Sequence, residues 1–400
     1  MRNNEITWDL YEAHRGAKQY KYMYQRMLDR DVIRLAYKKL RKGKTKRREI
    51  IAIDANFDAE VEAMREMILN TKPPGVEVEH PELAYKPHKR TPKIIYEHNK
   101  ARKIFMPEIH EQWLHHIIVL VIEPIIVRTS YRFSCGSFPN RGAHKAKRQL
   151  ERWIRAGKGI RHFAKIDIRH FYDSIRLRVL IKELSIRIKD EWFLYIIELC
   201  LKGFKKGIPL GFYISQWLAN YLLEPLDYFI TETLGFKIMV RYMDDIVFMG
   251  DNKKKLHAAI IEIKKFLGRR FRLKLKRTFI VAKFIYHTKT GRTIGRKINY
   301  MGFLFDRDKT TVRKCIMLQA TRLAARLSRK KQKNKHIYHR HVCAMVSYMG
   351  WFNWTDTYNC YLKWIKPYVN VGKLKRIISK LDRRKAEYES MERGTLRAAA

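Results

Sequence analysis

The chain has 400 residues, with 85 Lys or Arg against 39 Asp or Glu, so its formal net charge is +46. So much positive charge destabilises a compact state unless a polyanion is bound, and nucleic acid is the natural partner because Lys and Arg displace counterions from phosphates. A membrane-surface or ribosome-associated protein is the alternative, whereas 46% hydrophobic residues exclude a mainly disordered chain.

The N-terminal part of the chain is expected to be a basic extension. Residues 5–48 have helical periodicity and end in a basic cluster from Lys38 to Arg48, which is either a solvated face or an arm that contacts phosphates. Residues 58–70 predict a short helix. The Lys72-Pro-Pro-Gly75 sequence then starts a loop that extends to residue 92.

The next part mixes strands and helices. Residues 93–96 and 102–105 predict a β-hairpin, and residues 143–157 predict a basic amphipathic helix. Between them, residues 108–127 predict a helix that contains the most apolar stretch of the chain, Ile117 to Val127. This stretch is too short to cross a bilayer, so we expect a buried helix.

The five cysteines and the first residues concern the compartment. The cysteines are scattered and include no Cys-x-x-Cys pair, which fits a reducing environment. The sequence Met1-Arg-Asn-Asn-Glu lacks the apolar stretch of a signal peptide. We therefore expect a cytoplasmic protein without a membrane partner.

Acidic residues follow two apolar runs in the second half of the chain. Residues 162–168 predict a strand that holds Asp167, and residues 237–242 and 245–249 predict a hairpin around Asp244 and Asp245. After about residue 312 the chain becomes helical and basic. The other expected elements are helices at 175–200, 213–234 (with a kink at Pro225) and 253–270, and strands at 278–287 and 296–305.

The three aspartates could bind metal. Adjacent carboxylates repel each other and favour a bound cation. Joining a 3′ hydroxyl to a nucleoside triphosphate needs two Mg²⁺ ions about 3.5–4 Å apart, and Mg²⁺ takes oxygen ligands, few of them from protein. Asp167, Asp244 and Asp245 meet that need if their strands pair. The alternative is that aspartate is simply common in turns.

Five short motifs surround these aspartates. In chain order they are Lys100 to Pro107, Ala164 to Ile175, Gly207 to Gln216, Tyr242 to Asp245 and Ile298 to Phe305. Their order and spacing resemble the fingers and palm motifs of reverse transcriptases over residues 90–305. The Tyr-Met-Asp-Asp form is typical of reverse transcriptases, whereas RNA-templated RNA polymerases usually carry Gly-Asp-Asp.

The resemblance implies an RNA-directed DNA polymerase that uses two Mg²⁺ ions, for which Mn²⁺ can substitute. It implies that Asp167 and Asp244 are direct ligands, that Ile168 offers its backbone carbonyl, and that Asp245 is the less direct carboxylate. Tyr172 matches the aromatic steric gate that collides with a ribose 2′ hydroxyl and so favours deoxynucleotides. Without the motif, Tyr172 would be an ordinary core aromatic residue.

Further positions are implied to bind nucleotides and nucleic acid. Lys100 and Arg102 match residues that grip the incoming dNTP, since charge-assisted contacts to phosphate are strong. The templating base and sugar are supported by Gly211, Ser215 and Gln216. The segment that grips the primer contains Tyr300, Met301 and Gly302. One basic residue near the leaving group is expected among Lys274, Lys276 and Arg277.

Two segments resemble those of particular retroelement enzymes. The pattern Leu210-Gly211-x-x-x-Ser215-Gln216 is similar to that of reverse transcriptases of diversity-generating retroelements, and Arg132 to His144 resembles the segment before the palm in bacterial retroelement polymerases. This implies a bacterial or phage-encoded enzyme with a dedicated template RNA, an RNA/DNA hybrid product, a small basic oligomeric accessory protein, and error-prone copying. An antiphage-defence reverse transcriptase and a catalytically silent RNA-binding relative stay open as alternatives.

The resemblance also implies an α+β right-hand polymerase. The expected parts are a basic N-terminal extension at 1–90, fingers at 91–160, a palm of antiparallel sheet plus helices at 161–305 (with a fingers insertion at about 175–205), and a helical thumb with C-terminal tail at 306–400.

Overall fold

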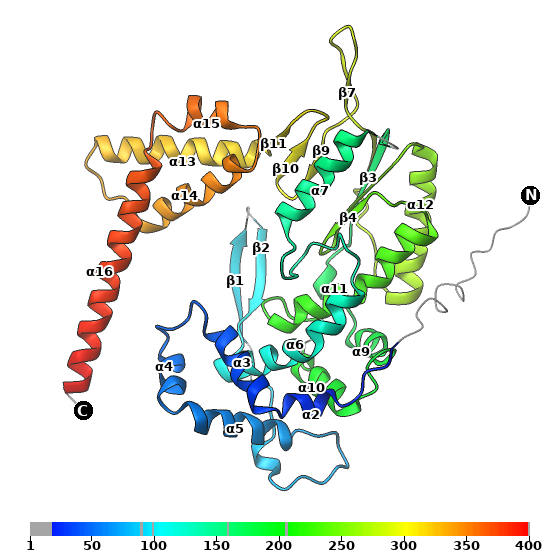
Figure 1. The fold of residues 1–400 in the computed structure, drawn as a ribbon. Helices are drawn as coiled ribbons and strands as arrows, with labels where there is room; N and C mark the ends of the chain where they lie inside the picture. The colour runs from blue at the N-terminus through cyan, green and yellow to red at the C-terminus, as the bar shows by residue number, and fades with distance from the viewer. Residues whose placement is uncertain (1–17, 89–90, 98–99, 158–159, 205–206, 399–400) are drawn as a thin grey trace, which may run out of the picture. The chain divides into compact units, whose positions relative to one another are not determined.

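The computed structural model describes residues 18–88, 91–97, 100–157, 160–204 and 207–398. The chain divides into two compact units (Figure 1). The first unit comprises residues up to 146 and residues 161–281, and the second comprises residues 147–160 and 282–400. The helices and antiparallel sheets confirm the predicted α+β class.

Short helices begin the first unit (blue in Figure 1). They are α2 (Met23–Met27), α3 (Arg30–Arg41), α4 (Arg48–Ala55) and α5 (Phe57–Leu69). The prediction of helix throughout 5–48 is wrong, because the Asp29 side chain accepts from the Asp31 amide and so caps the start of α3. That helix ends at Arg41 and is followed by Lys42 and by Gly43, which has a left-handed φ of +75°. Residues 1–17 lie outside the described part, and the helix predicted at 58–70 is confirmed as α5.

Helix α6 (Ile109–Thr129) lies in the core of the first unit. Twelve of its 21 residues are buried, and it continues through Pro124. It packs against α3 and α11 (Tyr213–Tyr228), and Nε1 of Trp113 donates to the Ile33 carbonyl at 2.9 Å. By length and composition alone, α6 is a helix that could cross a membrane, the one such helix among the described residues. Its burial is that of the core helix predicted from the sequence.

The central sheet of the first unit has the strand order β4-β5-β3-β6. Its strands are β3 (His162–Asp167), β4 (Met239–Tyr242), β5 (Asp245–Gly250) and β6 (Ile280–Lys283). Strand β5 pairs antiparallel with both β3 and β4, and α12 (Lys253–Phe266) packs against β3 and β5. Phe163, Ile166 and Val247 are among the buried aromatic and β-branched residues that favour these strands. The predicted strand at 162–168 and the hairpin around the aspartate pair are confirmed.

Other elements of the first unit also follow the predicted pattern. The hairpin of β1 (Pro92–Glu97) and β2 (Lys100–Phe105) is antiparallel. The helical part at 175–200 forms α9 (Leu177–Ser185) and α10 (Glu191–Leu201), after the short α8 (Phe171–Ser174). Helices α11 and α12 are each followed by a π-helical turn, at Phe229–Thr233 and Leu267–Phe271. Among its described residues, the loop predicted at 72–92 contains the 3-10 turn η1 (Pro81–Leu83) and no longer helix before β1 begins.

The second unit has its own core. It contains most of α7 (Ala143–Ala156), the antiparallel sheet β11-β10-β9 and a β7–β8 hairpin. The strands are β7 (Tyr286–His287), β8 (Thr293–Ile294), β9 (Ile298–Tyr300), β10 (Phe303–Phe305) and β11 (Thr310–Val312). The helices are α13 (Lys314–Gln332), α14 (His339–Asn353), α15 (Tyr358–Trp364) and α16 (Val371–Ala398). Ala324, Val342, Met345 and Phe352 belong to the apolar core of this bundle, which confirms the helical prediction beyond residue 312.

Candidate active site

Three aspartates gather at one end of the central sheet. Asp167 is the last residue of β3, Asp245 is the first residue of β5, and the two are direct partners in the antiparallel register. Directly opposed residues have Cα atoms about 4.5–5.5 Å apart with side chains on the same face. Asp244 lies in the Met243–Asp244 turn between β4 and β5, and its carbonyl accepts from the Ile168 amide at 3.3 Å. The strand pairing that a shared cation site requires is therefore present.

Two lysines contact this acidic cluster. Nζ of Lys276 lies 2.6 Å from Oδ2 of Asp167, and Nζ of Lys165 lies 3.1 Å from Oδ2 of Asp245. Lys276 is one of the three basic residues that the sequence placed in this region. The family resemblance assigns no role to Lys165, although it lies within the second motif, two residues before Asp167 and therefore on the same face of β3.

Burial and repulsion oppose ionisation of the aspartates. Burial, and then the charge of Asp167, raises the pKa of Asp244 to about 6. Burial also raises the pKa of Asp245, against the opposing charge of Lys165. A cation bound here would stabilise the charged carboxylates and reverse this effect.

The donor chemistry of the cluster fits a divalent cation. Oδ1 of Asp167 is buried, and no described residue supplies it with a hydrogen bond. Carboxylate oxygens of this kind are the ligands that Mg²⁺ prefers. Within the described ranges, however, no three Asp, Glu, His or Cys side chains are already grouped as a metal site. One oxygen of Asp167 and one of Asp245 are instead held by lysines.

Tyr172 lies on α8 close to the acidic cluster. Its pKa is raised by burial and then by the charge of Asp244, while the charge of Arg102 opposes this, so these three residues lie within electrostatic range. The Tyr172 carbonyl accepts from the Ile208 amide at 2.9 Å, and a Cβ on Gly207 would lie 2.0 Å from the same carbonyl oxygen. The third motif therefore packs against the second. The side chain of Lys100 lies outside the described part.

The motif around Gly211 packs against β2. The Phe105 amide donates to the Leu210 carbonyl at 2.8 Å, and a Cβ on Gly211 would lie 2.3 Å from the Phe105 carbonyl oxygen. Only glycine fits this close approach at a φ of +108°. Ser215 is fully buried, whereas Gln216 lines a cavity beside β2.

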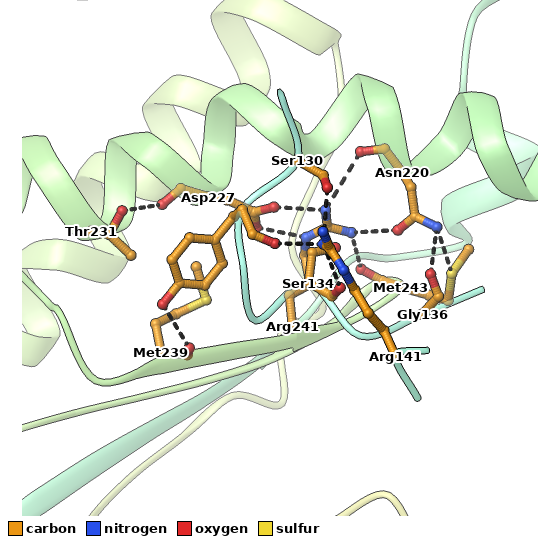
Figure 2. Close-up of polar contacts among 11 residues, drawn as sticks. Ser130, Ser134, Gly136, Arg141, Asn220, Asp227, Thr231, Met239, Arg241 and Met243 are labelled. Atoms are coloured by element: carbon orange, nitrogen blue, oxygen red, sulfur yellow. Dashed lines mark hydrogen bonds and ion pairs between the residues drawn. The ribbon is translucent and has the colours of Figure 1, made fainter. Parts of the chain in front are cut away.

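A buried arginine supports the turn that carries Asp244 (Figure 2). The Arg241 guanidinium is fully buried and donates to both carboxylate oxygens of Asp227, at 2.6 and 2.7 Å. Its Nη1 also donates to Oδ1 of Asn220 at 3.0 Å and to the Met243 carbonyl at 3.1 Å. A buried charge is costly unless it is paired and hydrogen-bonded. The pairing therefore fixes Arg241 and, through Met243, the backbone next to Asp244.

Gly136 supports the same turn from another direction. Nδ2 of Asn220 donates to the Gly136 carbonyl at 2.8 Å, as Figure 2 shows. A Cβ on Gly136 would lie 2.5 Å from Sδ of Met243, and Met243 has a left-handed φ of +55°, which is uncommon for a residue with a side chain. The family resemblance assigns no role to Asn220, or to Gly136 within the Arg132 to His144 segment. The one available signal is Arg241, a charge inside an apolar strand, which requires a buried acidic partner.

The predicted primer-grip residues belong to the second unit. Tyr300 ends β9 and is fully buried. Met301 and Gly302 form the turn to β10, with left-handed φ values of +49° and +86°. A Cβ on Gly302 would lie 2.5 Å from the Trp351 ring. The turn is thus held against α14 within its own unit.

Comparison with known proteins gives a family match over most of the motifs. Residues 88–305, more than half of the chain, match the profile of the family described as Reverse transcriptase (RNA-dependent DNA polymerase). Protein YkfC of Escherichia coli (strain K12) is 23% identical over 154 residues, covering 33% of this chain and 38% of that protein.

Solved structures of telomerase are also similar. Telomerase from Candida albicans in complex with a fragment of telomeric RNA matches with a TM-score of 0.43 and 11% identity, covering 76% of this chain and 65% of that chain. Apo telomerase from Candida tropicalis matches with a TM-score of 0.44 and 12% identity, covering 70% and 55%. The chain therefore covers less than two thirds of the length of each of these relatives.

Proposed function

The chain belongs to the reverse transcriptase family of RNA-directed DNA polymerases, and we propose that it synthesises cDNA from dNTPs on an RNA template. The observation that carries this proposal is the register of the central sheet, in which Asp167 opposes Asp245 while Asp244 occupies the adjoining turn. Side chains on neighbouring strands are positioned more rigidly than side chains on loops. That rigidity suits in-line nucleotidyl transfer, which depends on alignment of the reacting groups.

The metal ligands we propose are Asp167 and Asp244 with the carbonyl of Ile168, and Asp245 as the less direct carboxylate. Two Mg²⁺ ions, or Mn²⁺ in their place, would activate the primer hydroxyl and stabilise the leaving oxygens. The unsatisfied Oδ1 of Asp167 supports this assignment. The ammonium groups of Lys165 and Lys276 would hold the carboxylates in place when no cation is bound, since each is already paired with one of them.

Other residues would select and orient the substrates. Arg102, with Lys100, would bind the triphosphate of the dNTP, and the ring of Tyr172 would exclude a ribose 2′ hydroxyl. The electrostatic proximity of Tyr172 to Asp244 and Arg102 supports this arrangement. Gly211, Ser215 and Gln216 would support the template nucleotide. The primer would be held by Tyr300, Met301 and Gly302.

The polymerase parts we assign are an extension at 1–90, fingers at 91–160, a palm at 161–305 and a thumb with tail at 306–400. The cDNA template would be a dedicated RNA of a bacterial or phage retroelement, copied in the cytoplasm with errors that diversify a target gene. A small basic accessory protein would assist. The Leu210-Gly211-x-x-x-Ser215-Gln216 pattern supports this role over antiphage defence. Two near-identical repeats beside the gene that differ at adenine positions would favour diversification over antiphage defence.

A primer-extension assay tests the activity. The purified chain is given a primed RNA template, dNTPs and Mg²⁺, and the Asp244→Asn variant is compared with it. We expect extension by the wild type and at least a hundredfold slower extension by the variant, because a preorganised charge that acts on the transition state is typically worth that much. RNA affinity should be unchanged, which serves as the control for folding.

Two results would contradict the proposal. Equal extension by wild type and Asp244→Asn would remove the metal-ligand role of Asp244. RNA binding without any extension by the wild type, even with its own RNA and accessory protein, would favour a catalytically silent RNA-binding relative.

A further inference from the structure

A cavity of about 260 Å³ opens in the first unit, at a distinct set of residues from the three aspartates. Its walls come from three stretches: Lys44 and Arg47 in the loop between α3 and α4, residues 104–116, and residues 211–216. The hydrogen bond between the Phe105 amide and the Leu210 carbonyl joins the last two stretches. At about 260 Å³ the cavity lies just below the roughly 300–1,000 Å³ that is typical of small-molecule pockets, so it has room for no more than a single nucleotide.

One wall of the cavity is a pair of stacked rings. His116 lies against Tyr213 with ring centroids 4.1 Å apart and an interplanar angle of 21°. Burial, and then the charges of Lys44 and Lys39, lowers the pKa of His116 to about 4, so its imidazole is neutral at pH 7. Its Nδ1 is buried without a hydrogen-bond partner among the described residues. The cavity therefore offers a flat neutral ring as one wall.

Two positively charged side chains, Lys44 and Arg47, also line the cavity. Lys44 is half-buried, and burial and the charge of Arg47 lower its pKa. The Lys44 ammonium donates to the Leu40 carbonyl at 3.1 Å, but no described carboxylate forms an ion pair with Lys44 or Arg47. Two like charges held close together without an acidic partner are stabilised by a bound anion. An anion beside a flat ring is the chemistry of a nucleotide.

We propose that this cavity binds one unpaired nucleotide of the single-stranded RNA template, with its phosphate at Lys44 and Arg47 and its base at His116 and Tyr213. Stacking on an aromatic ring beside a positive charge is how single-stranded nucleic acid is bound without sequence preference. That the strand is the template rests on the proposed function. Gln216, a residue of the template-side motif, lines the same cavity. Lys44 and Arg47 lie outside the family match at 88–305, so the N-terminal extension supplies the phosphate contacts.

The test compares two hybrids of one sequence, a blunt RNA/DNA duplex and the same duplex with a 5′ RNA overhang. Fluorescence anisotropy measures their affinity for the full chain in EDTA without dNTPs. We expect the Lys44→Ala/Arg47→Ala pair to bind the overhang hybrid about tenfold more weakly and the blunt hybrid as well as the wild type does. Lys38→Ala/Lys42→Ala is the matched control, because it removes the same charge from exposed positions of the same segment.

Photocross-linking adds a second measurement. An overhang carrying 5-iodouridine should cross-link to the peptide that contains His116 or Tyr213, and the Lys44→Ala/Arg47→Ala pair should reduce the yield. The proposal would be overturned if both alanine pairs weakened the binding of the overhang hybrid equally, or if Lys44→Ala/Arg47→Ala weakened the binding of both hybrids equally. Either result would mean that the lost affinity comes from the net charge and not from the cavity. A third result would also overturn the proposal: Lys44→Ala/Arg47→Ala weakens the binding of dATP but not the binding of the overhang hybrid. The ligand of the cavity would then be a free nucleotide. Because no synthesis is measured, a chain without polymerase activity would still give a decisive result.

Discussion

At Asp244, folding and cation binding make opposing demands. Burial and the charge of Asp167 raise its pKa from an ordinary 3.8 to about 6. A carboxyl group whose pKa is higher in the folded than in the unfolded chain destabilises the fold wherever it is ionised. This cost is present above the folded pKa and is relieved as pH falls from about 6 towards 3.8. The ionised Asp244 thus lowers the free energy of unfolding of the metal-free protein, and a bound cation would remove this cost.

We therefore expect Asp244→Asn to stabilise the metal-free protein at pH 7.5, by on the order of 1–3 kcal/mol. The gain should shrink as pH falls through about 6, because the wild-type carboxyl then takes up its proton. Urea unfolding in EDTA at several pH values measures this. Asp173→Asn, at an exposed position on α8, is the matched control and should show no such trend. A constant difference at every pH would contradict the electrostatic cost.

The sequence identifies the acidic residues of this site but not their partners. Asp167, Asp244 and Asp245 follow apolar runs that read clearly as strands, and the motifs fix their order. Lys165 and Lys276 become partners only through the register of β3 with β5 and the return of the chain beside Asp167. Single-sequence patterns contain no information on register between distant strands, so these ion pairs could not be predicted.

Among the elements, the β4–β5 turn depends most on its surroundings. It has a left-handed residue at Met243 and carries Asp244. Helix α11 supplies Asp227 and Asn220, which bind Arg241 next to the turn, and Gly136 leaves no space on its other side. The turn is thus held by a helix and a loop that are distant in the sequence. Asn220 acts on Asp244 only through its neighbours, so we regard it as a positioning residue.

For Asn220→Ala we expect the rate of nucleotide addition to fall about 10- to 100-fold with little change in the KM for dNTP, since small misplacements of a reacting group are costly. The half-saturating Mg²⁺ concentration should rise. Single-turnover extension at varied Mg²⁺ and dNTP measures both effects.

Glu224→Gln on the same helix is the control for Asn220→Ala. Glu224 is buried and paired with Arg187 at 2.8 Å, and its hydrogen bonds within the described part of the chain are with Arg187 and Thr129 rather than with the turn. Its substitution should lower stability while leaving activity per folded molecule unchanged. If both variants lose activity in proportion to stability, Asn220 is merely structural.

Prediction of whole elements succeeds where the hydrophobic period is strong. Strand β5 and the helices α6 and α11 bury most of their residues, whereas β3 and α5 each bury three residues. All five elements are predicted. The error at residues 5–48 arises because periodicity continues across Asp29 and Gly43, which end one helix and begin another. Local caps and turns interrupt a helix without changing the average hydrophobic period of the sequence. The period alone therefore does not show where one helix ends and the next begins.

At the scale of the whole molecule, the division into two units is not visible in the sequence. Residues 147–160 lie between two stretches of the first unit, yet they pack with the chain beyond residue 282. Arg307, for example, donates to the Ile160 carbonyl at 3.3 Å. The excess of positive charge, in contrast, can be read directly. It occurs in both units and distinguishes the chain from an ordinary globular protein of its size.

A net charge of +46 leads to two opposite salt dependences. Self-repulsion destabilises the compact chain, and salt screens it over a Debye length of about 10 Å at 0.1 M. We therefore expect the melting temperature of the RNA-free protein to rise with KCl. Binding of RNA releases counterions, so its affinity should fall by a factor of about ten or more between about 50 and 200 mM salt. Scanning fluorimetry and anisotropy over one salt series measure both quantities.

At low salt, heparin should raise the melting temperature as KCl does, because a polyanion neutralises the same charges. A melting temperature that does not respond to KCl, alongside falling RNA affinity, would mean that the excess charge is spaced widely enough to leave the fold unstrained.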